Sequence, residues 1–220
     1  ERLMVVGDSG AYFIGEALVE SSGDDTIVLP RGVVGCGIAN TGGGAWTDDG
    51  TFLPDPAGCE NWPTEWASDV AAFEPDHVLL VLSWPGIGDR ENDGVRRHPC
   101  EPEFDEMYAE RVSLAVETAG STGADVVVAT APYYVGAGSD TLPQDRIDCL
   151  NRVMTSTARA NGGAVLELAE WTCPDGECRL SLNGETLRPD GLHFDGAGGQ
   201  IAADWILEQL RSGLLTTGTD

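Results

Sequence analysis

Short apolar runs alternate with longer amphipathic stretches along most of the chain. The runs HVLLVLS and DVVVATA are apolar almost throughout, which is typical of strands that are covered on both faces of a sheet. The longer stretches place apolar side chains at the spacing of one helix face. The pattern predicts strands at residues 3–6, 26–29, 77–83, 125–130 and 164–168, and helices at residues 11–20, 62–73, 104–119, 145–161 and 197–210.

This alternation also predicts the fold class. Strands that alternate with helices and are joined by short loops form a parallel sheet with helices on both faces. We therefore expect one α/β/α domain over residues 1–212 and a loose tail at residues 213–220. In such sheets the functional site lies beyond the carboxyl ends of the strands. That edge holds Ser9, residues 35–44 and residues 83–93.

Composition indicates a folded and strongly acidic domain. The chain has 220 residues, of which 41% are apolar and 22% are charged, enough for a substantial core. Its formal charge is −25, and all 12 basic residues are arginine. Such a surface repels phosphate backbones, so we expect no nucleic-acid partner. No apolar run reaches the roughly 20 residues that span a bilayer.

The chain starts at a glutamate, without an initiator methionine or a signal peptide. This start favours a domain excised from a longer protein over a processed mature form. We expect the isolated domain to be monomeric.

Six cysteines allow fifteen full pairings, and the sequence alone does not select one of them. The turn-forming Pro-Asp-Gly in CPDGEC can bring its two cysteines together, and proximity and elimination pair the other four. A zinc site is the alternative, but no second C-x-x-C motif or nearby histidine supports it. Disulfides indicate an oxidising compartment outside the cytosol. The expected bonds are Cys36–Cys59, Cys100–Cys149 and Cys173–Cys178.

The stretch VVGDSG places Ser9 at a predicted strand-to-helix turn. Free backbone N–H groups and the helix dipole favour negative charge at such a turn. One interpretation is a helix N-cap, because Asp and Ser are common caps. The other is a nucleophile, which needs a base to take its proton.

Three histidines are candidates for that base. His77 opens a predicted strand, which favours a structural role, and His98 lies in the loop RRHPC. His193 lies in RPDGLHF, three residues after Asp190 and across a glycine. At that spacing the carboxylate can hold one ring nitrogen and leave the other to accept the serine proton. The alternative is an exposed loop in which Asp190 only caps a turn.

Together, GDSG near the start and DGLH near the end resemble the SGNH, or GDSL-like, hydrolase family. The blocks occur in the family's order over nearly the whole chain. The resemblance implies a flavodoxin-like, three-layer α/β/α fold with a five-stranded parallel sheet. It also implies acyl transfer, with Ser9 as the nucleophile, His193 as the base and Asp190 as the carboxylate that orients the base.

The oxyanion hole implied by the resemblance has three donors. The first two are the backbone N–H groups of Ser9 and Gly35, with Gly37 as a close alternative to the second. The third departs from the family pattern, because LSWPGIGDREND stands where Gly-x-Asn-Asp is usual. Its Asn92-Asp93 pair lies well beyond the predicted strand, and Asn92 is the candidate donor. Four further residues are expected to shape the pocket: Asp8, Trp84, Asp89 and Arg90.

Further features are similar to the extracytoplasmic SGNH domains fused to integral-membrane acyltransferases in bacteria, notably actinobacteria. They are a GC in the second block, a tryptophan after the third strand, the DR that follows and RPDGLHF. This similarity implies O-acylation, such as acetylation, of cell-envelope glycans outside the cytoplasm. The expected partners are an acylated small molecule or glycan substrate and a fused membrane domain.

Two alternatives to this function stay open. A secreted esterase that acts on acetylated carbohydrate or on lipid would use the same residues. A glycan-binding domain without activity would instead use tryptophans as a stacking surface: Trp46, Trp62, Trp66 and Trp84. We expect no cofactor and no metal, since neither a phosphate-binding glycine loop nor a histidine-rich cluster occurs.

Overall fold

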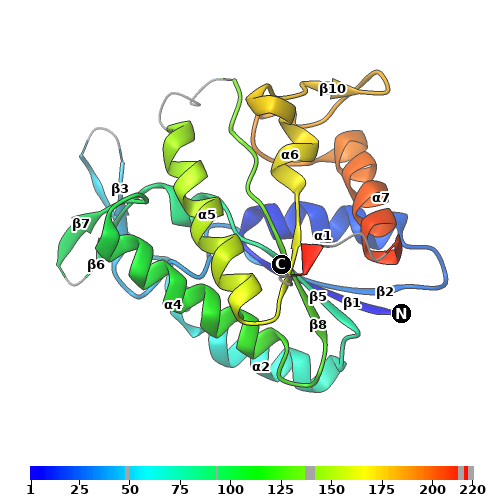
Figure 1. The fold of residues 1–220 in the computed structure, drawn as a ribbon, viewed down its shortest axis with the longest axis horizontal. Coiled ribbons are helices and arrows are strands. Elements are labelled where there is room, and N and C mark those ends of the chain that lie inside the picture. The colour runs from blue at the N-terminus through cyan, green and yellow to red at the C-terminus, as the bar shows by residue number, and fades with distance from the viewer. Residues whose placement is uncertain (48–49, 93, 137–141, 213–215, 218–220) are drawn as a thin grey trace.

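A parallel sheet of five strands forms the centre of the molecule (Figure 1). The computed structural model describes residues 1–47, 50–92, 94–136, 142–212 and 216–217, and only the backbone of Trp84, Asn92, Thr216 and Thr217. The five parallel strands follow the order β9-β8-β5-β1-β2. This is the flavodoxin-like order, and it confirms the predicted fold class. The strands are β1 (Arg2–Gly7), β2 (Ile27–Gly32), β5 (His77–Val81), β8 (Asp125–Ala129) and β9 (Ala164–Leu166).

Helices cover both faces of this sheet (Figure 1). Helices α1 and α7 pack together on one face, while α2, α4 and α5 lie on the other. Their bounds differ from the predicted helices by no more than two residues. They are α1 (Ser9–Ser21), α2 (Trp62–Phe73), α4 (Pro102–Ala119), α5 (Gln144–Ala160) and α7 (Gly196–Ser212).

Strand β5 shows why the central runs are apolar throughout. Val78 and Leu80 belong to the core beneath α2, α4 and α5, whereas Leu79 and Val81 belong to the core beneath α1 and α7. All four are buried. Successive strand side chains point to opposite faces, so a strand covered twice needs an apolar residue at every position.

Three strands end two or more residues away from the prediction. Strand β9 ends at Leu166 rather than residue 168, because helix α6 (Leu168–Thr172) begins there. Strand β2 continues beyond Leu29 to Gly32, because β2 is an edge strand and an edge tolerates Pro30. Strand β5 ends at Val81 rather than Ser83. Ser83 leaves the sheet since its backbone N–H and its hydroxyl both donate to Asp8.

A second, antiparallel sheet was not predicted. Its strand order is β4-β3-β6-β7, and it joins the loop after β2 to the segment after β5. Strands this short carry no readable apolar alternation, which explains the omission. The strands are β3 (Gly44–Trp46), β4 (Phe52–Pro54), β6 (Asp89–Asn92) and β7 (Val95–Arg97). Also unpredicted are α3 (Trp84–Ile87), α6 (Leu168–Thr172), β10 (Ser181–Leu182), β11 (Glu185–Thr186) and 3-10 turns at Cys59–Asn61 and Pro174–Gly176.

The tail that the sequence predicts to be loose contains a short strand. Residues Thr216–Thr217 form β12, which pairs antiparallel with β9 at the edge of the main sheet. An exposed edge offers unpaired backbone groups to a passing segment, and this explains the pairing.

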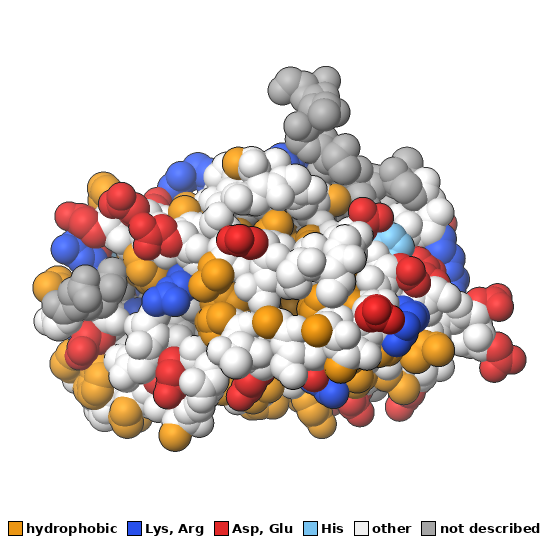
Figure 2. Space-filling view, turned by 90° about the horizontal axis from the view of Figure 1, so that it is seen from below, with side chains coloured by type: hydrophobic (Ala, Val, Ile, Leu, Met, Phe, Trp, Pro, Cys, Tyr) orange, Lys and Arg blue, Asp and Glu red, His pale blue; other side chains and the backbone are white. Residues whose placement is uncertain are grey.

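The surface carries acidic side chains over much of the face in Figure 2, where apolar side chains gather near the middle. Within the described part of the chain, no helix has the length and apolar character needed to cross a membrane.

Candidate active site

Ser9, His193 and Asp190 come together at the carboxyl edge of the sheet. The Nε2 atom of His193 lies 2.7 Å from Ser9 Oγ, and the Nδ1 atom of the same ring lies 2.6 Å from Asp190 Oδ2. With Nδ1 donating to the carboxylate, Nε2 is the acceptor that faces the serine hydroxyl. The arrangement is that of a serine nucleophile, a base and a carboxylate that orients the base.

The turn after β1 places Ser9 at the first position of α1. Gly7 makes this turn with a φ of +139°, and a Cβ on it would lie 1.9 Å from the carbonyl oxygen of Val81. Asp8 caps the helix by accepting a hydrogen bond of 2.8 Å from the N–H of Gly10. Asp8, and not Ser9, is therefore the N-cap of α1. The Ser9 hydroxyl is free of that role and contacts His193.

Asp8, predicted to shape the pocket, is fully buried and ties β1 to β5. Its carboxylate accepts from the Ser83 N–H at 2.7 Å and from the Ser83 hydroxyl at 3.1 Å. Burial raises the pKa of Asp8 to about 6, although the hydrogen bonds from Ser83 and Gly10 and the charge of His193 oppose this rise. Asp8 thus holds the turn that carries Ser9 against the end of β5.

The DGLH loop is held by the carboxylate of Asp190. Besides the histidine ring, Asp190 accepts from the backbone N–H groups of Leu192 at 2.9 Å and His193 at 2.7 Å. Burial alone would raise the pKa of Asp190, but the hydrogen bonds from His193 and Leu192 and the charge of the histidine lower it on balance. The carboxylate therefore stays charged as the partner of the ring. The ring also packs against Phe13, with the centroids 4.6 Å apart.

Gly191 gives this loop its shape. Its φ is +80°, and a Cβ here would lie 1.5 Å from the carbonyl oxygen of Val135. The two segments are joined by a bond of 3.1 Å from the Val135 N–H to the Gly191 carbonyl. Only glycine permits this approach, which sets the position of Asp190 and His193.

The expected oxyanion donors differ in their surroundings. Ser9 starts α1, where backbone N–H groups have no partner within the helix. Gly35 lies in the loop after β2, exposed and with a φ of +79°. The N–H of Gly37, the alternative to Gly35, donates to Asn40 Oδ1 at 2.6 Å and is thereby engaged. Asn92 ends β6, but its side chain lies outside the described part of the chain.

Asp93 likewise lies outside the described residues, and of Trp84 only the backbone, at the start of α3, is described. Asp89 pairs with Arg96 and with Arg146, the latter at 2.7 Å. The two expected pocket residues that remain, Asp89 and Arg90, are both held in ion pairs.

A buried polar chain that the sequence does not reveal holds the loop after β2. Arg90, nearly inaccessible, pairs with Asp55. Asp55 in turn accepts from Asn40 Nδ2 at 2.7 Å and from the Thr41 N–H at 3.1 Å. Asn40 closes the chain by accepting from Gly37. Asparagine in a glycine-rich loop reads as a turn residue, so no local signal identifies this role.

Arg188, in the RPDGLHF stretch, is a second buried group that the sequence did not single out. Its Nη1 donates to the Tyr133 carbonyl at 2.7 Å. Burial lowers the pKa of Arg188 to about 10, while Tyr134 and Asp190 counteract this change. The positive charge therefore lies close enough to Asp190 to favour its charged form.

The remaining candidates lie elsewhere. His77 pairs with Glu1 at 2.9 Å, and His98 lies 3.4 Å from Glu101. Of the tryptophans proposed as a stacking surface, Trp62 and Trp66 are packed into the core, each 5% exposed. The cysteines form the three expected bonds, Cys36–Cys59, Cys100–Cys149 and Cys173–Cys178. No group of three or more metal-ligating side chains occurs among the residues described.

Comparison with known proteins places this geometry in a family. Residues 2–209 match the family model described as "Protein of unknown function (DUF459)", and no curated protein matches the sequence significantly. The periplasmic domain of a lipopolysaccharide acetyltransferase from Salmonella ser. Paratyphi A has a TM-score of 0.66 and 13% identity, over 96% of this chain and 83% of that one. A lipase/acylhydrolase from Enterococcus faecalis has a TM-score of 0.61 and 19% identity, over 100% of both chains.

An acetyl xylan esterase from Geobacillus stearothermophilus has a TM-score of 0.59 and 17% identity, over 96% of this chain and 94% of that one. Likeness at this identity establishes the fold, and the fold agrees with the motif order and the three assembled side chains. The chain therefore belongs to the DUF459 family and has the fold of the SGNH-like hydrolases.

Proposed function

We propose that this domain transfers O-acyl groups, acetyl above all, to or from cell-envelope glycans through an acyl-Ser9 intermediate. The observation that carries the proposal is the unbroken chain of contacts from Ser9 through His193 to Asp190. A domain that only binds glycans has no need for such a chain. A secreted carbohydrate or lipid esterase would use the same chemistry with water as the acceptor.

The chemistry proceeds in two halves. Ser9 Oγ attacks the acyl carbonyl carbon and forms a new C–O bond, while His193 Nε2 takes the hydroxyl proton. Backbone N–H donors stabilise the negative oxygen that develops. The bond to the leaving alkoxide then breaks, and His193 returns the proton to that oxygen. In the second half the hydroxyl of an acceptor, or water, attacks the acyl-Ser9 ester while His193 Nε2 takes its proton. The bond between the acyl carbon and Ser9 Oγ then breaks, and His193 returns the proton to Ser9.

Two findings support a location outside the cytoplasm and a glycan substrate. Three disulfides are typical of proteins from oxidising compartments. Among proteins with this fold are a periplasmic lipopolysaccharide acetyltransferase domain and an acetyl xylan esterase, both named for polysaccharides. A fused membrane domain remains part of the proposal on the sequence resemblance alone.

Hydrolysis of p-nitrophenyl acetate tests the nucleophile. We expect activity in the wild-type domain, its loss in Ser9→Ala, and its retention in the control Ser68→Ala, a serine exposed on α2. Mass spectrometry of the quenched reaction should find one added acetyl group on Ser9. Equal rates for the wild type and Ser9→Ala, together with no acetylation from an acetylated glycan, would leave the glycan-binding alternative.

A further inference from the structure

We propose that a cavity beside Ser9, between the loop after β2 and the start of α2, seats one neutral sugar ring whose acylated hydroxyl faces the nucleophile. This inference rests on the proposed function and names the substrate class of the same site. It goes beyond the three catalytic side chains, none of which lines the cavity.

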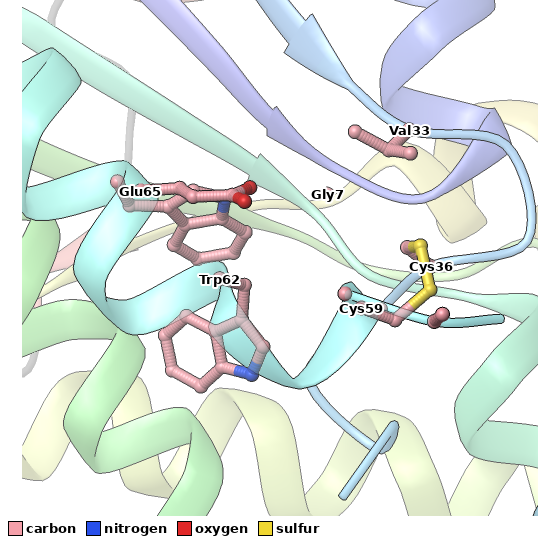
Figure 3. Close-up of a pocket in the computed structure, with 10 residues that line it drawn as sticks. Gly7, Val33, Cys36, Cys59, Trp62 and Glu65 are labelled. Carbon is pink, nitrogen blue, oxygen red and sulfur yellow. A yellow bond between two sulfur atoms is a disulfide. The ribbon is translucent and has the colours of Figure 1, made fainter. Parts of the chain in front are cut away.

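The cavity has a volume of about 190 Å³. Figure 3 shows Trp62 and Glu65 of α2 on one side, the Cys36–Cys59 disulfide on the other and Val33 above. The lining residues are Gly7, Val33, Cys36, Gly37, Ala57, Gly58, Cys59, Trp62, Glu65 and Trp66.

The position of the cavity links it to the reaction. Gly7 lines it and precedes Ser9 by two residues, so their Cα atoms lie within about 7.6 Å. Val33, also in the lining, donates from its N–H to the Gly7 carbonyl at 3.0 Å. Gly35, the candidate oxyanion donor, lies in the chain between the lining residues Val33 and Cys36. A ligand in the cavity is thus bordered by the segment that carries the nucleophile and by the loop of Gly35.

The chemistry of the lining favours a neutral polyol. Glu65 is the one ionisable side chain among the lining residues, apart from the two bonded cysteines, and its carboxylate points toward Gly7 (Figure 3). A carboxylate accepts hydrogen bonds from sugar hydroxyls and repels anionic groups. Val33, which is 49% exposed, gives the cavity an apolar wall that suits the C–H face of a sugar ring, while the buried Trp62 and Trp66 contribute little exposed surface. A charged carboxylate in the wall disfavours a fatty acyl chain.

The size of the cavity limits the ligand to one ring. A volume of about 190 Å³ lies below the roughly 300–1,000 Å³ that is usual for pockets that hold drug-sized ligands. A longer glycan would therefore place its other residues outside the cavity.

Calorimetry on the Ser9→Ala protein tests whether the cavity binds a sugar ring, because this variant lacks the nucleophile and should not hydrolyse the probe. The probes are methyl glucoside, galactoside and mannoside that carry one O-acetyl group, and the matching methyl glucuronoside. We expect at least one neutral probe to bind about tenfold or more tightly than the glucuronoside. Glu65→Gln should narrow this difference, while the control Glu117→Gln, exposed on α4, should not.

A second variant fills the space. Ala57 is exposed and lines the cavity, so Ala57→Phe in the Ser9→Ala protein should abolish binding of the neutral probe. Three results would overturn the proposed sugar site. They are equal binding of neutral and charged probes, no binding of any neutral probe, and unchanged binding in Ala57→Phe. Absence of p-nitrophenyl acetate and sugar-ester turnover alongside selective binding would overturn the catalytic function alone.

Discussion

Gly191→Ala tests whether the DGLH loop is held in place by backbone contact. The new Cβ would lie 1.5 Å from the Val135 carbonyl oxygen, whereas real Cβ contacts are essentially never below 3.0 Å. The loop must therefore retreat by about 1.5 Å. His193 Nε2 lies 2.7 Å from Ser9 Oγ, so a shift of that size takes the pair beyond hydrogen-bond distance.

A misplacement of about 1 Å near the reacting groups can lower the rate by about 10²-fold, and we expect at least this loss in kcat for p-nitrophenyl acetate. The control is Gly184→Ala in the β10–β11 turn, where φ is +89° and nothing lies within 4 Å of a Cβ. It imposes the same left-handed strain, which costs about 1–2 kcal/mol, without the collision. If Gly191→Ala and Gly184→Ala kept equal activity after correction for folded protein, the reasoning about the loop would be wrong.

Three further predictions concern charge and hydrogen bonding at the site. The pKa of Asp8 is raised from 3.8 to about 6 in the folded state, so folding binds a proton between those pH values. The free energy of unfolding should therefore fall by up to about 3 kcal/mol as the pH rises through that window. Urea titrations at several pH values should show this decrease in the wild type and not in Asp8→Asn. Asp190→Asn should lower kcat by about 10²–10⁴-fold with a small change in KM, since the ring loses the carboxylate that selects its tautomer; an unchanged kcat would contradict this role. Asn40→Leu removes the acceptor for the Gly37 N–H and a donor to the buried Asp55 carboxylate. It should lower the free energy of unfolding by about 1–3 kcal/mol and also lower kcat. The control Asn161→Leu, after the last turn of α5, should lower only the melting temperature.

The sequence predicts the main sheet because its strands are buried on both faces. HVLLVLS has no polar residue between His77 and Ser83, and burial of β5 between two helix layers requires this pattern. The candidate catalytic residues were predicted for a related reason, since GDSG and DGLH each contain the local geometry that such residues need. Asp8 caps α1, and Asp190 binds a histidine three residues away.

Contacts between segments that are distant along the chain produce no comparable pattern in the sequence. The small sheet is made of short strands whose pairing joins residues such as Ala45 and Arg90. The hydrogen bond from Asn40 to Asp55 likewise depends on two loops meeting. Such partners are chosen by the fold as a whole, and no period or spacing within either loop specifies them.

The segment after β5, where the sequence differs from Gly-x-Asn-Asp, is bound to the turn that carries Ser9. Ser83 there gives both its N–H and its hydroxyl to Asp8, and Pro85, which has no N–H, packs where a Cβ on Gly37 would be only 3.1 Å from its ring. Ser83 therefore stabilises the turn that carries Ser9 by holding Asp8.

The candidate oxyanion donors that the structure describes are the backbone N–H groups of Ser9 and Gly35. Binding energy from parts of a substrate away from the reacting bond can orient that bond and raise kcat. A sugar ring seated beside Gly7 would supply that orientation, whereas p-nitrophenyl acetate lacks it. We therefore expect kcat/KM for a mono-acetylated sugar to exceed that for p-nitrophenyl acetate, despite the poorer leaving group, and Ala57→Phe to remove this advantage.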